Sequence, residues 1–148
     1  MNKESTALPE ISVQNRQRKI ALDRAALERF ARRALPLCAR ERGRGLTSLE
    51  EIAVLLIADR KISALHHRFM QVEGPTDVIT FQHGEIFISV ETARRQADAH
   101  HTSLDHELRL YLVHGLLHLH GFDDCVPAGR RRMQAVQEKI VLTAGRGL

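Results

Sequence analysis

The sequence has few aromatic residues, few cysteines and no long hydrophobic run. Its 148 residues include no tryptophan, one tyrosine, five phenylalanines and two cysteines. Cys38 and Cys125 are too few for a disulfide framework, so we expect free thiols. The longest apolar run, residues 53–58, is far shorter than the roughly 18 residues that span a bilayer, so we expect no membrane partner. The N-terminus lacks the apolar core of a secretory signal, and we expect a cytoplasmic protein.

Length and composition predict one folded domain. A chain of 148 residues matches the size of a single domain, and its 43% hydrophobic and 27% charged residues are typical of a globular protein. We expect a flexible lead-in over residues 1–10, one domain over 11–144 and a tail over 145–148. The net charge of +4 provides a modest attraction to polyanions such as RNA.

The hydrophobic pattern predicts an α+β domain. Strands are expected at 11–15, 51–58, 77–81 and 85–90. Helices are expected at 26–38, 62–69, 91–101, 104–120 and 128–144. Asp23, Asp59 and Thr102 are the predicted N-caps, and Pro36 is expected to kink or end its helix. This order predicts a small mixed four-stranded sheet with helices gathered after it.

Two histidines one helical turn apart are the strongest candidates for a chemical site. His114 and His118 occupy positions i and i+4 of the expected helix 104–120, so both imidazoles point from one face toward one metal ion. Gly121 is suited to end the helix and turn the chain back, which brings Asp124 within reach as a third ligand. Burying unpartnered imidazoles on this apolar helix would cost about 1 to 3 kcal/mol, which favours a metal site.

Neighbouring residues leave alternatives open. Asp123 and Cys125 compete for the third ligand position. Glu107 and Tyr111 share the helical stripe of His114 and are candidates to surround the metal or line a catalytic cleft. The alternative interpretation is that the paired histidines are core residues bonded to backbone carbonyls. His120 points to another side of the helix and is predicted to be a bystander.

The motif spacing resembles that of the metzincin proteases, H-E-x-x-H-x-x-G-x-x-H, with Asp in the last place. In those proteases the Glu after the first His is the general base that activates water. Here that position is Gly115, which has no side chain. The ligand spacing is kept and the peptidase base is absent, so proteolysis is disfavoured.

Two motifs in the same order resemble the YbeY family of bacterial metal-dependent endoribonucleases. The family's H-G-x-L-H-L-x-G-Y-D-H is matched by residues 114–124, and its P-T-D-V-(L/I)-(S/T)-F by residues 75–81. The resemblance runs over about residues 11–140. It implies a zincin-like fold, one zinc ion held by His114, His118 and Asp124, and hydrolysis of single-stranded RNA.

The resemblance also implies a role in 16S rRNA 3′ end maturation and ribosome quality control, with rRNA and the ribosome or its small subunit as partners. A metal-bound water would attack the RNA, with Glu107, Asp123 and His106 as candidates for proton transfer. Few aromatic side chains are present to stack bases, which favours recognition of the RNA backbone. The alternatives are a non-catalytic ribosome-associated factor with a structural metal, and a metallohydrolase acting on another substrate.

Two positions depart from the family pattern. Asp124 stands where the family commonly has His, and this harder oxygen ligand shifts metal preference toward manganese or iron. Met70 stands where the family often has an Arg that faces the substrate. Arg68 is the nearest candidate to bind substrate instead, although it lies about 200° around a helix from that position.

Overall fold

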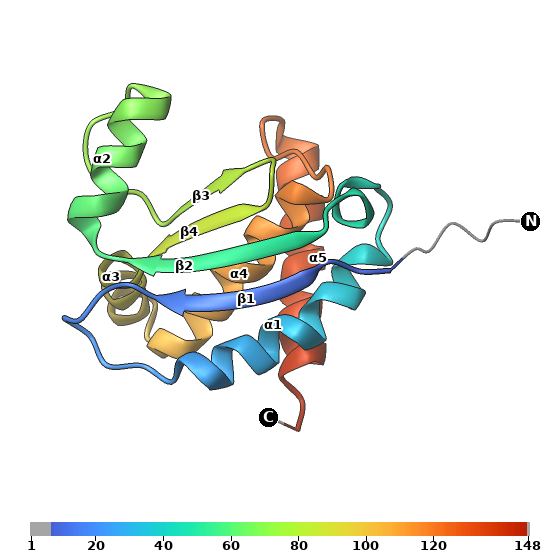
Figure 1. Ribbon diagram of the computed structural model, residues 1–148, viewed down its shortest axis with the longest axis horizontal. Coiled ribbons are helices and arrows are strands. Elements are labelled where there is room, and N and C mark those ends of the chain that lie inside the picture. The colour runs from blue at the N-terminus through green and yellow to red at the C-terminus, as the bar shows by residue number, and fades with distance from the viewer. Residues whose placement is uncertain (1–6, 148) are drawn as a thin grey trace, which may run out of the picture.

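The computed structural model describes residues 7–147 and has the predicted order of elements (Figure 1). The strands are β1 (Glu10–Asn15), β2 (Glu51–Ile57), β3 (Val78–Phe81) and β4 (Glu85–Ser89). The helices are α1 (Arg24–Ala39), α2 (Asp59–Met70), α3 (Val90–His100), α4 (Leu104–Leu119) and α5 (Pro127–Gly145), with a short 3-10 helix, η1 (Gly45–Ser48). The prediction of an α+β domain is confirmed. Residues 1–6 of the predicted lead-in and residue 148 of the predicted tail lie outside the described residues.

The four strands form one mixed sheet in the order β1-β2-β4-β3. β1, β2 and β4 are parallel, and the edge strand β3 runs antiparallel to β4. Figure 1 shows α4 and α5 behind the sheet, with α1 along its β1 side. α4 contacts α1, α3, α5, β3 and β4, so it is the central helix of the fold.

The sheet buries apolar side chains on both faces. Val54 and Leu56 of β2 and Ile86 of β4 belong to the main core, which they share with α1, α4 and α5. On the other face, Ile57 and Ile79 pack against Ile62 of α2 in a smaller cluster. The continuous apolar run of β2 is therefore explained by burial on two sides, as its pattern predicted.

Two predicted N-caps differ from the structure, and Pro36 does not end its helix. α1 runs past Pro36 to Ala39, with Cys38 buried in its last turn. Asp59 is the first residue of α2 rather than its cap, and its carboxylate bonds to α3 instead. Ser103, one residue after the predicted Thr102, caps α4.

Both cysteines are free thiols, as predicted: Cys38 is buried and Cys125 is exposed. Among residues 7–147, no helix has both the length and the apolar character that crossing a membrane requires.

Candidate metal centre

Helix α4 carries both histidines on a buried scaffold. Ser103 caps its start by accepting a hydrogen bond from the backbone N–H of His106. Most of the following side chains are apolar and buried against the surrounding helices and the sheet, so the helix cannot rotate without exposing core residues. His114 and His118 interrupt this apolar surface and keep 26% and 27% of their side-chain area exposed. The two imidazoles therefore lie together and are accessible.

A glycine turns the chain back at the end of α4. Gly121 has a φ of 105°, a left-handed conformation in which a side chain would be strained. Its N–H donates to the carbonyl of His118 at 3.1 Å, and the N–H of Phe122 donates to the carbonyl of Leu117 at 2.9 Å. This pair of bonds is a Schellman motif, which satisfies the last carbonyls of the helix. The turn directs the following segment back along α4 and brings Asp124 beside the histidines.

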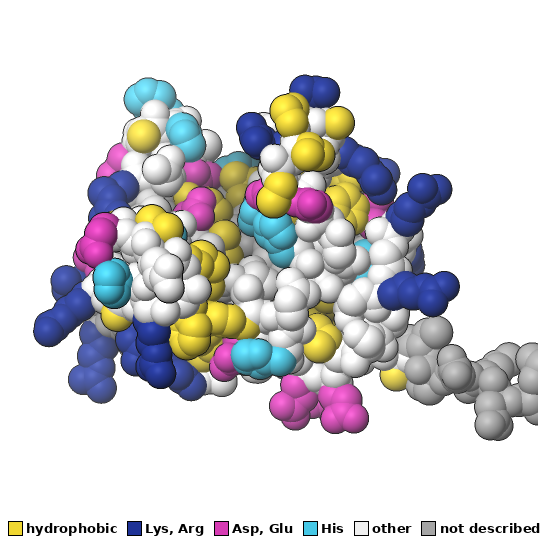
Figure 2. All heavy atoms as spheres, turned by 90° about the horizontal axis from the view of Figure 1, so that it is seen from above, with side chains coloured by type: hydrophobic (Ala, Val, Ile, Leu, Met, Phe, Trp, Pro, Cys, Tyr) yellow, Lys and Arg dark blue, Asp and Glu magenta, His cyan; other side chains and the backbone are white. Residues whose placement is uncertain are grey.

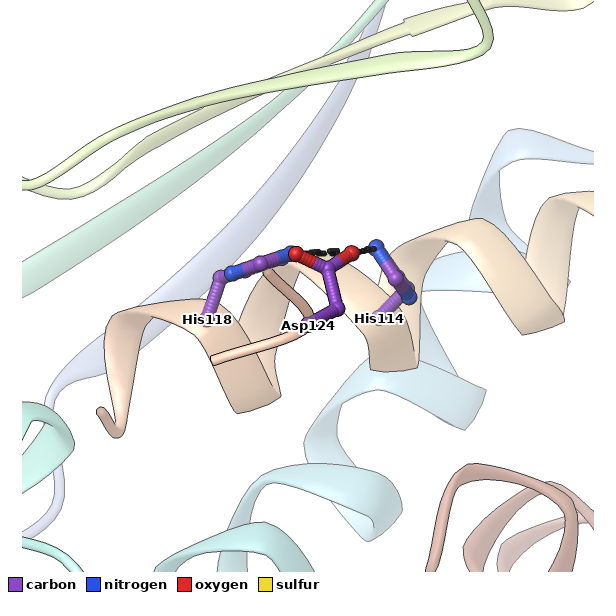
Figure 3. A group of neighbouring side chains, drawn as sticks. All are labelled: His114, His118 and Asp124. Carbon is purple, nitrogen blue, oxygen red and sulfur yellow. Dashed lines mark hydrogen bonds and ion pairs between the residues drawn. The ribbon is translucent and has the colours of Figure 1, made fainter. Parts of the chain in front are cut away.

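His114, His118 and Asp124 place three ligand atoms around one point (Figure 3). The Nε2 atoms of the two histidines are 3.1 Å apart, and Oδ2 of Asp124 lies 3.6 Å and 3.5 Å from them. A tetrahedral ion with ligands at about 2.0 to 2.2 Å separates those ligands by roughly 3.3 to 3.6 Å. The three residues therefore fit one divalent metal ion with a coordination position left for substrate or water.

The electrostatics of the group also favour a cation. Burial lowers the pKa of His118 and the nearby His114 lowers it further, against the opposing effect of Asp124. A neutral imidazole presents one lone pair, and an ionised carboxylate offers only acceptors. When both lone pairs are turned toward Asp124 they repel its carboxylate, and a positive ion between the three groups removes that repulsion.

Close packing against the sheet explains Gly115. A Cβ atom at this position would lie 2.7 Å from Cγ2 of Ile86 on β4, inside the distance of a normal contact. α4 therefore approaches β4 too closely for a glutamate after the first histidine. The absence of the metzincin base follows from this packing.

Two cavities open on the ligand group. The larger, about 620 Å³, is lined by residues of α3, α4 and α5, and the smaller, about 300 Å³, lies against β3 and the end of α2. His114, Asp124 and Asp77 line both cavities, so the ligand group lies where the two meet. Figure 2 shows histidine and acidic side chains gathered in a hollow of this surface.

The second sequence motif forms one wall of the same site. Asp77 fixes the start of β3, because its carboxylate accepts a hydrogen bond from the N–H of Val78 at 2.8 Å. Val78, Ile79 and Thr80 then line the smaller cavity opposite His114. Residues 75–81 and 114–124, which are distant in the sequence, therefore meet at one centre.

Glu107 is a buried carboxylate on the wall of the larger cavity. Only 4% of its side-chain area is exposed, and its Oε1 lies 3.2 Å from Nδ1 of His100. Tyr111 and His106 line the same cavity. Burial raises the pKa of Tyr111, and Asp77 and Glu107 raise it further, so the phenol stays protonated at neutral pH. The predicted stripe of Glu107, Tyr111 and His114 thus faces one cavity.

Asp123 and Cys125 lie on another side of the α4–α5 turn. Asp123 accepts a hydrogen bond from the N–H of Cys125 at 2.8 Å, and bonds from Cys125 lower its pKa. Asp123 lines a separate cavity together with Arg132, and neither it nor Cys125 lines the two cavities described above. With Asp124 these two residues form a second, more exposed group of ligand atoms.

Of Arg68 and Met70, only Met70 lies at the ligand group. The Arg68 guanidinium lies 5.2 Å from the ring centre of Phe69, and Arg68 lines neither cavity at the ligand group. Met70 lines the smaller cavity. His120 is fully buried and bonds through Nε2 to the carbonyl of Glu41 at 2.8 Å, in keeping with the role of bystander.

Two residues near the site were not identified from the sequence. Gln137 of α5 contacts Nδ1 of His114. The sequence feature that could have indicated it is a polar residue within the apolar stripe of this helix. Arg130 lines the larger cavity and donates from Nε to the carbonyl of Asp124 at 3.4 Å. It is one of three consecutive arginines, and nothing in the sequence distinguishes it from the other two.

Comparison with known proteins identifies the family. The family described as Endoribonuclease YbeY matches residues 12–145. Endoribonuclease YbeY of Gluconobacter oxydans is 36% identical over 126 residues, which cover 81% of this chain and 75% of the relative. Endoribonuclease YbeY of Heliobacterium modesticaldum is 37% identical over 116 residues, which cover 64% of this chain and 70% of the relative.

A solved structure agrees with the fold. The solution structure of TM1509 from Thermotoga maritima matches 90% of this chain and 88% of its own, with a TM-score of 0.64 and 23% sequence identity. Together with the sequence matches over most of the chain, this establishes the relationship. The chain therefore belongs to the endoribonuclease YbeY family, and this membership supports an endoribonuclease role.

Proposed function

We propose that this protein cleaves internal linkages of single-stranded RNA with a zinc ion held by His114, His118 and Asp124. One observation carries the proposal: the ligand group lies at the junction of two open cavities. A chain that enters one cavity and leaves through the other presents an internal phosphodiester to the ligands. A duplex is too stiff and too wide to follow that path, so the substrate is single-stranded.

The three ligands and the residues around them have separate roles in the proposed hydrolysis. When bound, a divalent ion supplies Lewis acidity at a phosphoryl oxygen and lowers the pKa of water in contact with it. His114 and His118 hold their ligand atoms on a rigid helix, and Asp124 closes the group from the turn. Arg130, on the wall of the larger cavity, is placed to contact a phosphate.

Glu107 is the residue we assign to proton transfer. Its carboxylate is buried, yet it lines the cavity that His114 and Asp124 share. From there it accepts the proton of the attacking nucleophile, and the paired His100 imidazole stabilises the carboxylate. Asp123 is a weaker candidate because it lines a different cavity.

Exposed hydrophobic side chains at the end of α2 provide a place for unstacked bases. Phe69, Met70 and Val72 are 54%, 49% and 45% exposed, and Met70 lines the cavity itself. Phe69 packs edge-on against Phe81 at 5.2 Å, which holds its ring in place. Bases stack on such exposed rings with little regard to sequence. Phe81 packs in the smaller core cluster with Ile62 of α2, so these rings offer bases a surface at the end of α2, next to Met70 in the sequence.

We place the protein in the cytoplasm, acting on rRNA in 16S rRNA 3′ end maturation and ribosome quality control, with the ribosome or its small subunit presenting the RNA. The support is membership of the family together with the net charge of +4. Zinc suits two imidazoles and a carboxylate, and the carboxylate of Asp124 also admits manganese or iron.

The second candidate function is a ribosome-associated factor with a structural metal. The observation in its favour is the exposed group of Asp123, Asp124 and Cys125, because thiolates are common ligands of structural zinc. In that case the metal would be bound through sulfur.

Circular single-stranded RNA tests the proposal directly, because it has no ends for an exonuclease. Zinc-loaded protein is expected to linearise the circle and to leave a duplex of the same sequence intact. An identically purified His118→Ala variant controls for contaminating nuclease and should not cut. Intact circles in the presence of protein with one bound zinc, or equal cutting by the variant, would contradict the proposal.

A further inference from the structure

Helix α5 carries one polar residue inside its buried stripe. Met133, Ile140 and Ala144 recur at helical spacing and are at most 3% exposed where they pack into the core. Gln137 falls on this stripe between Met133 and Ile140 and is half-buried. An unpartnered amide at such a position would destabilise the fold, so its partner matters.

The partner of Gln137 is the first metal-binding histidine. Its Oε1 lies 2.8 Å from Nδ1 of His114, which is the ring nitrogen facing away from His118 and Asp124. An amide oxygen only accepts hydrogen bonds, so Nδ1 carries the proton and Nε2 carries the lone pair. The opposite tautomer would place a proton on Nε2, between the ligand atoms, and would block metal binding.

We propose that Gln137 is a positioning residue that fixes the tautomer and ring orientation of His114 and thereby sets metal affinity. The inference rests on the proposed metal centre and extends it to α5, which begins after the turn that supplies Asp124. Partners of this kind commonly change metal affinity by 10- to 100-fold when they are removed. A neutral amide achieves this without adding a second negative charge next to Asp124.

The contact also couples the docking of α5 to metal binding. α5 packs on α4, and Met133 and Ile140, which lie on either side of Gln137 in the sequence, belong to the main core. A metal ion that orders His114 therefore stabilises the packing of α5 on α4. In turn, the packed position of α5 raises the affinity for the metal by the same factor. Zinc should raise the melting temperature of the wild type more than that of a variant without the contact.

Zinc affinity measured by competition with a chromophoric chelator tests this role. Gln137→Leu keeps the size and removes the acceptor, and we expect 10- to 100-fold weaker binding. Gln137→Glu keeps an acceptor and should bind zinc at least as tightly as the wild type. Gln134→Leu is the matched control, because Gln134 lies on the same helix and lines the same cavity without contacting a ligand.

Unchanged affinity in Gln137→Leu, or equal losses in Gln137→Leu and Gln134→Leu, would overturn the proposal. A second measurement does not require a substituted chain to fold: nitrogen NMR of the metal-free wild type reports the His114 tautomer. We expect a proton on Nδ1, and a proton on Nε2 would refute the role of Gln137. If the wild type bound no zinc, the proposed metal centre and the effect of Gln137 on zinc affinity would both fail, while the tautomer would still decide whether Gln137 orients His114.

Discussion

Two polar clusters of this molecule have similar burial and different partners for their carboxylates. In the first, Asp59 of α2 accepts bonds from Ser89 Oγ at 2.6 Å, Thr92 Oγ1 at 2.7 Å and Arg95 Nη1 at 2.6 Å. In the second, the carboxylate of Asp124 faces the Nε2 atoms of His114 and His118, and all three groups can bind a metal ion. One carboxylate is surrounded by hydrogen-bond donors and a permanent positive charge, and the other by two side chains that can themselves be metal ligands.

The difference separates a structural cluster from a ligand-binding one. Asp59 ties α2 to α3 and needs nothing from solution, because its charge is balanced by Arg95. The histidine group has no permanent positive charge of its own and has the spacing to hold a divalent cation. Changes to the first cluster should therefore alter stability without altering metal binding, and changes to the second should do the reverse.

The largest expected effect is on metal binding in His118→Ala. Loss of one of three ligands should abolish tight zinc binding and with it the zinc-dependent rise in melting temperature. In the wild type, a free zinc concentration of 100 times the dissociation constant should stabilise the fold by about 2.7 kcal/mol. The measurement is a thermal scan with and without zinc. His67→Ala, which removes an exposed histidine of α2, should behave as the wild type. A zinc response retained in His118→Ala would place the metal elsewhere.

A smaller effect is expected on catalysis in Glu107→Gln. Removing the proton acceptor should slow RNA cleavage by about 10²- to 10⁴-fold and leave zinc affinity within a few-fold of the wild type. Single-turnover cleavage and chelator competition measure the two quantities. Asp105→Asn makes the same chemical change at an exposed position of α4 and serves as control. Wild-type cleavage rates in Glu107→Gln would remove this residue from the mechanism.

RNA affinity should fall by about tenfold in Phe69→Ala, the loss of roughly one base-stacking contact. Fluorescence anisotropy with single-stranded RNA and a cleavage-inactive His118→Ala background would measure it without turnover. Leu142→Ala, an exposed apolar residue of α5, is the matched control. Equal affinities of the two variants would show that bases do not stack at the end of α2.

The smallest expected effect is on the free energy of unfolding, through Asp59 and its three hydrogen-bond donors. Burial would raise the pKa of Asp59, but the hydrogen bonds from Arg95, Ser89 and Thr92 outweigh it and lower that pKa. The ionised form therefore stabilises the fold above the unfolded-state pKa of about 4, and this stabilisation is lost as pH falls through the lower folded-state value.

Asp59→Asn should accordingly lower the free energy of unfolding by roughly 1 kcal/mol at pH 7, a modest value because Arg95 is largely exposed. Urea unfolding at pH 7 and pH 3 should show the difference from wild type shrinking in acid. Asp98→Asn on the exposed face of α3 is the control. A pH-independent difference, or a change in zinc affinity, would contradict the structural role.

The sequence predicted the elements and the ligand group because both follow from local spacing. The i, i+4 histidines and the helix-ending Gly121 determine where Asp124 returns, and alternating or continuous apolar runs determine the strands. Gln137 and Arg130 could not be placed, since their positions depend on how α5 packs against α4. Local spacing predicts Asp59 as a cap, whereas the three donors that it binds lie about 30 to 36 residues further along the chain, beyond the reach of a local pattern.

X-ray absorption spectroscopy of the protein loaded with one equivalent of zinc tests the central claim most directly. If His114, His118 and Asp124 bind the metal, the spectrum will show only nitrogen and oxygen ligands at about 2.0 to 2.2 Å, with the multiple scattering of two imidazoles. A sulfur ligand at about 2.3 Å would assign the metal to Cys125 and contradict the account.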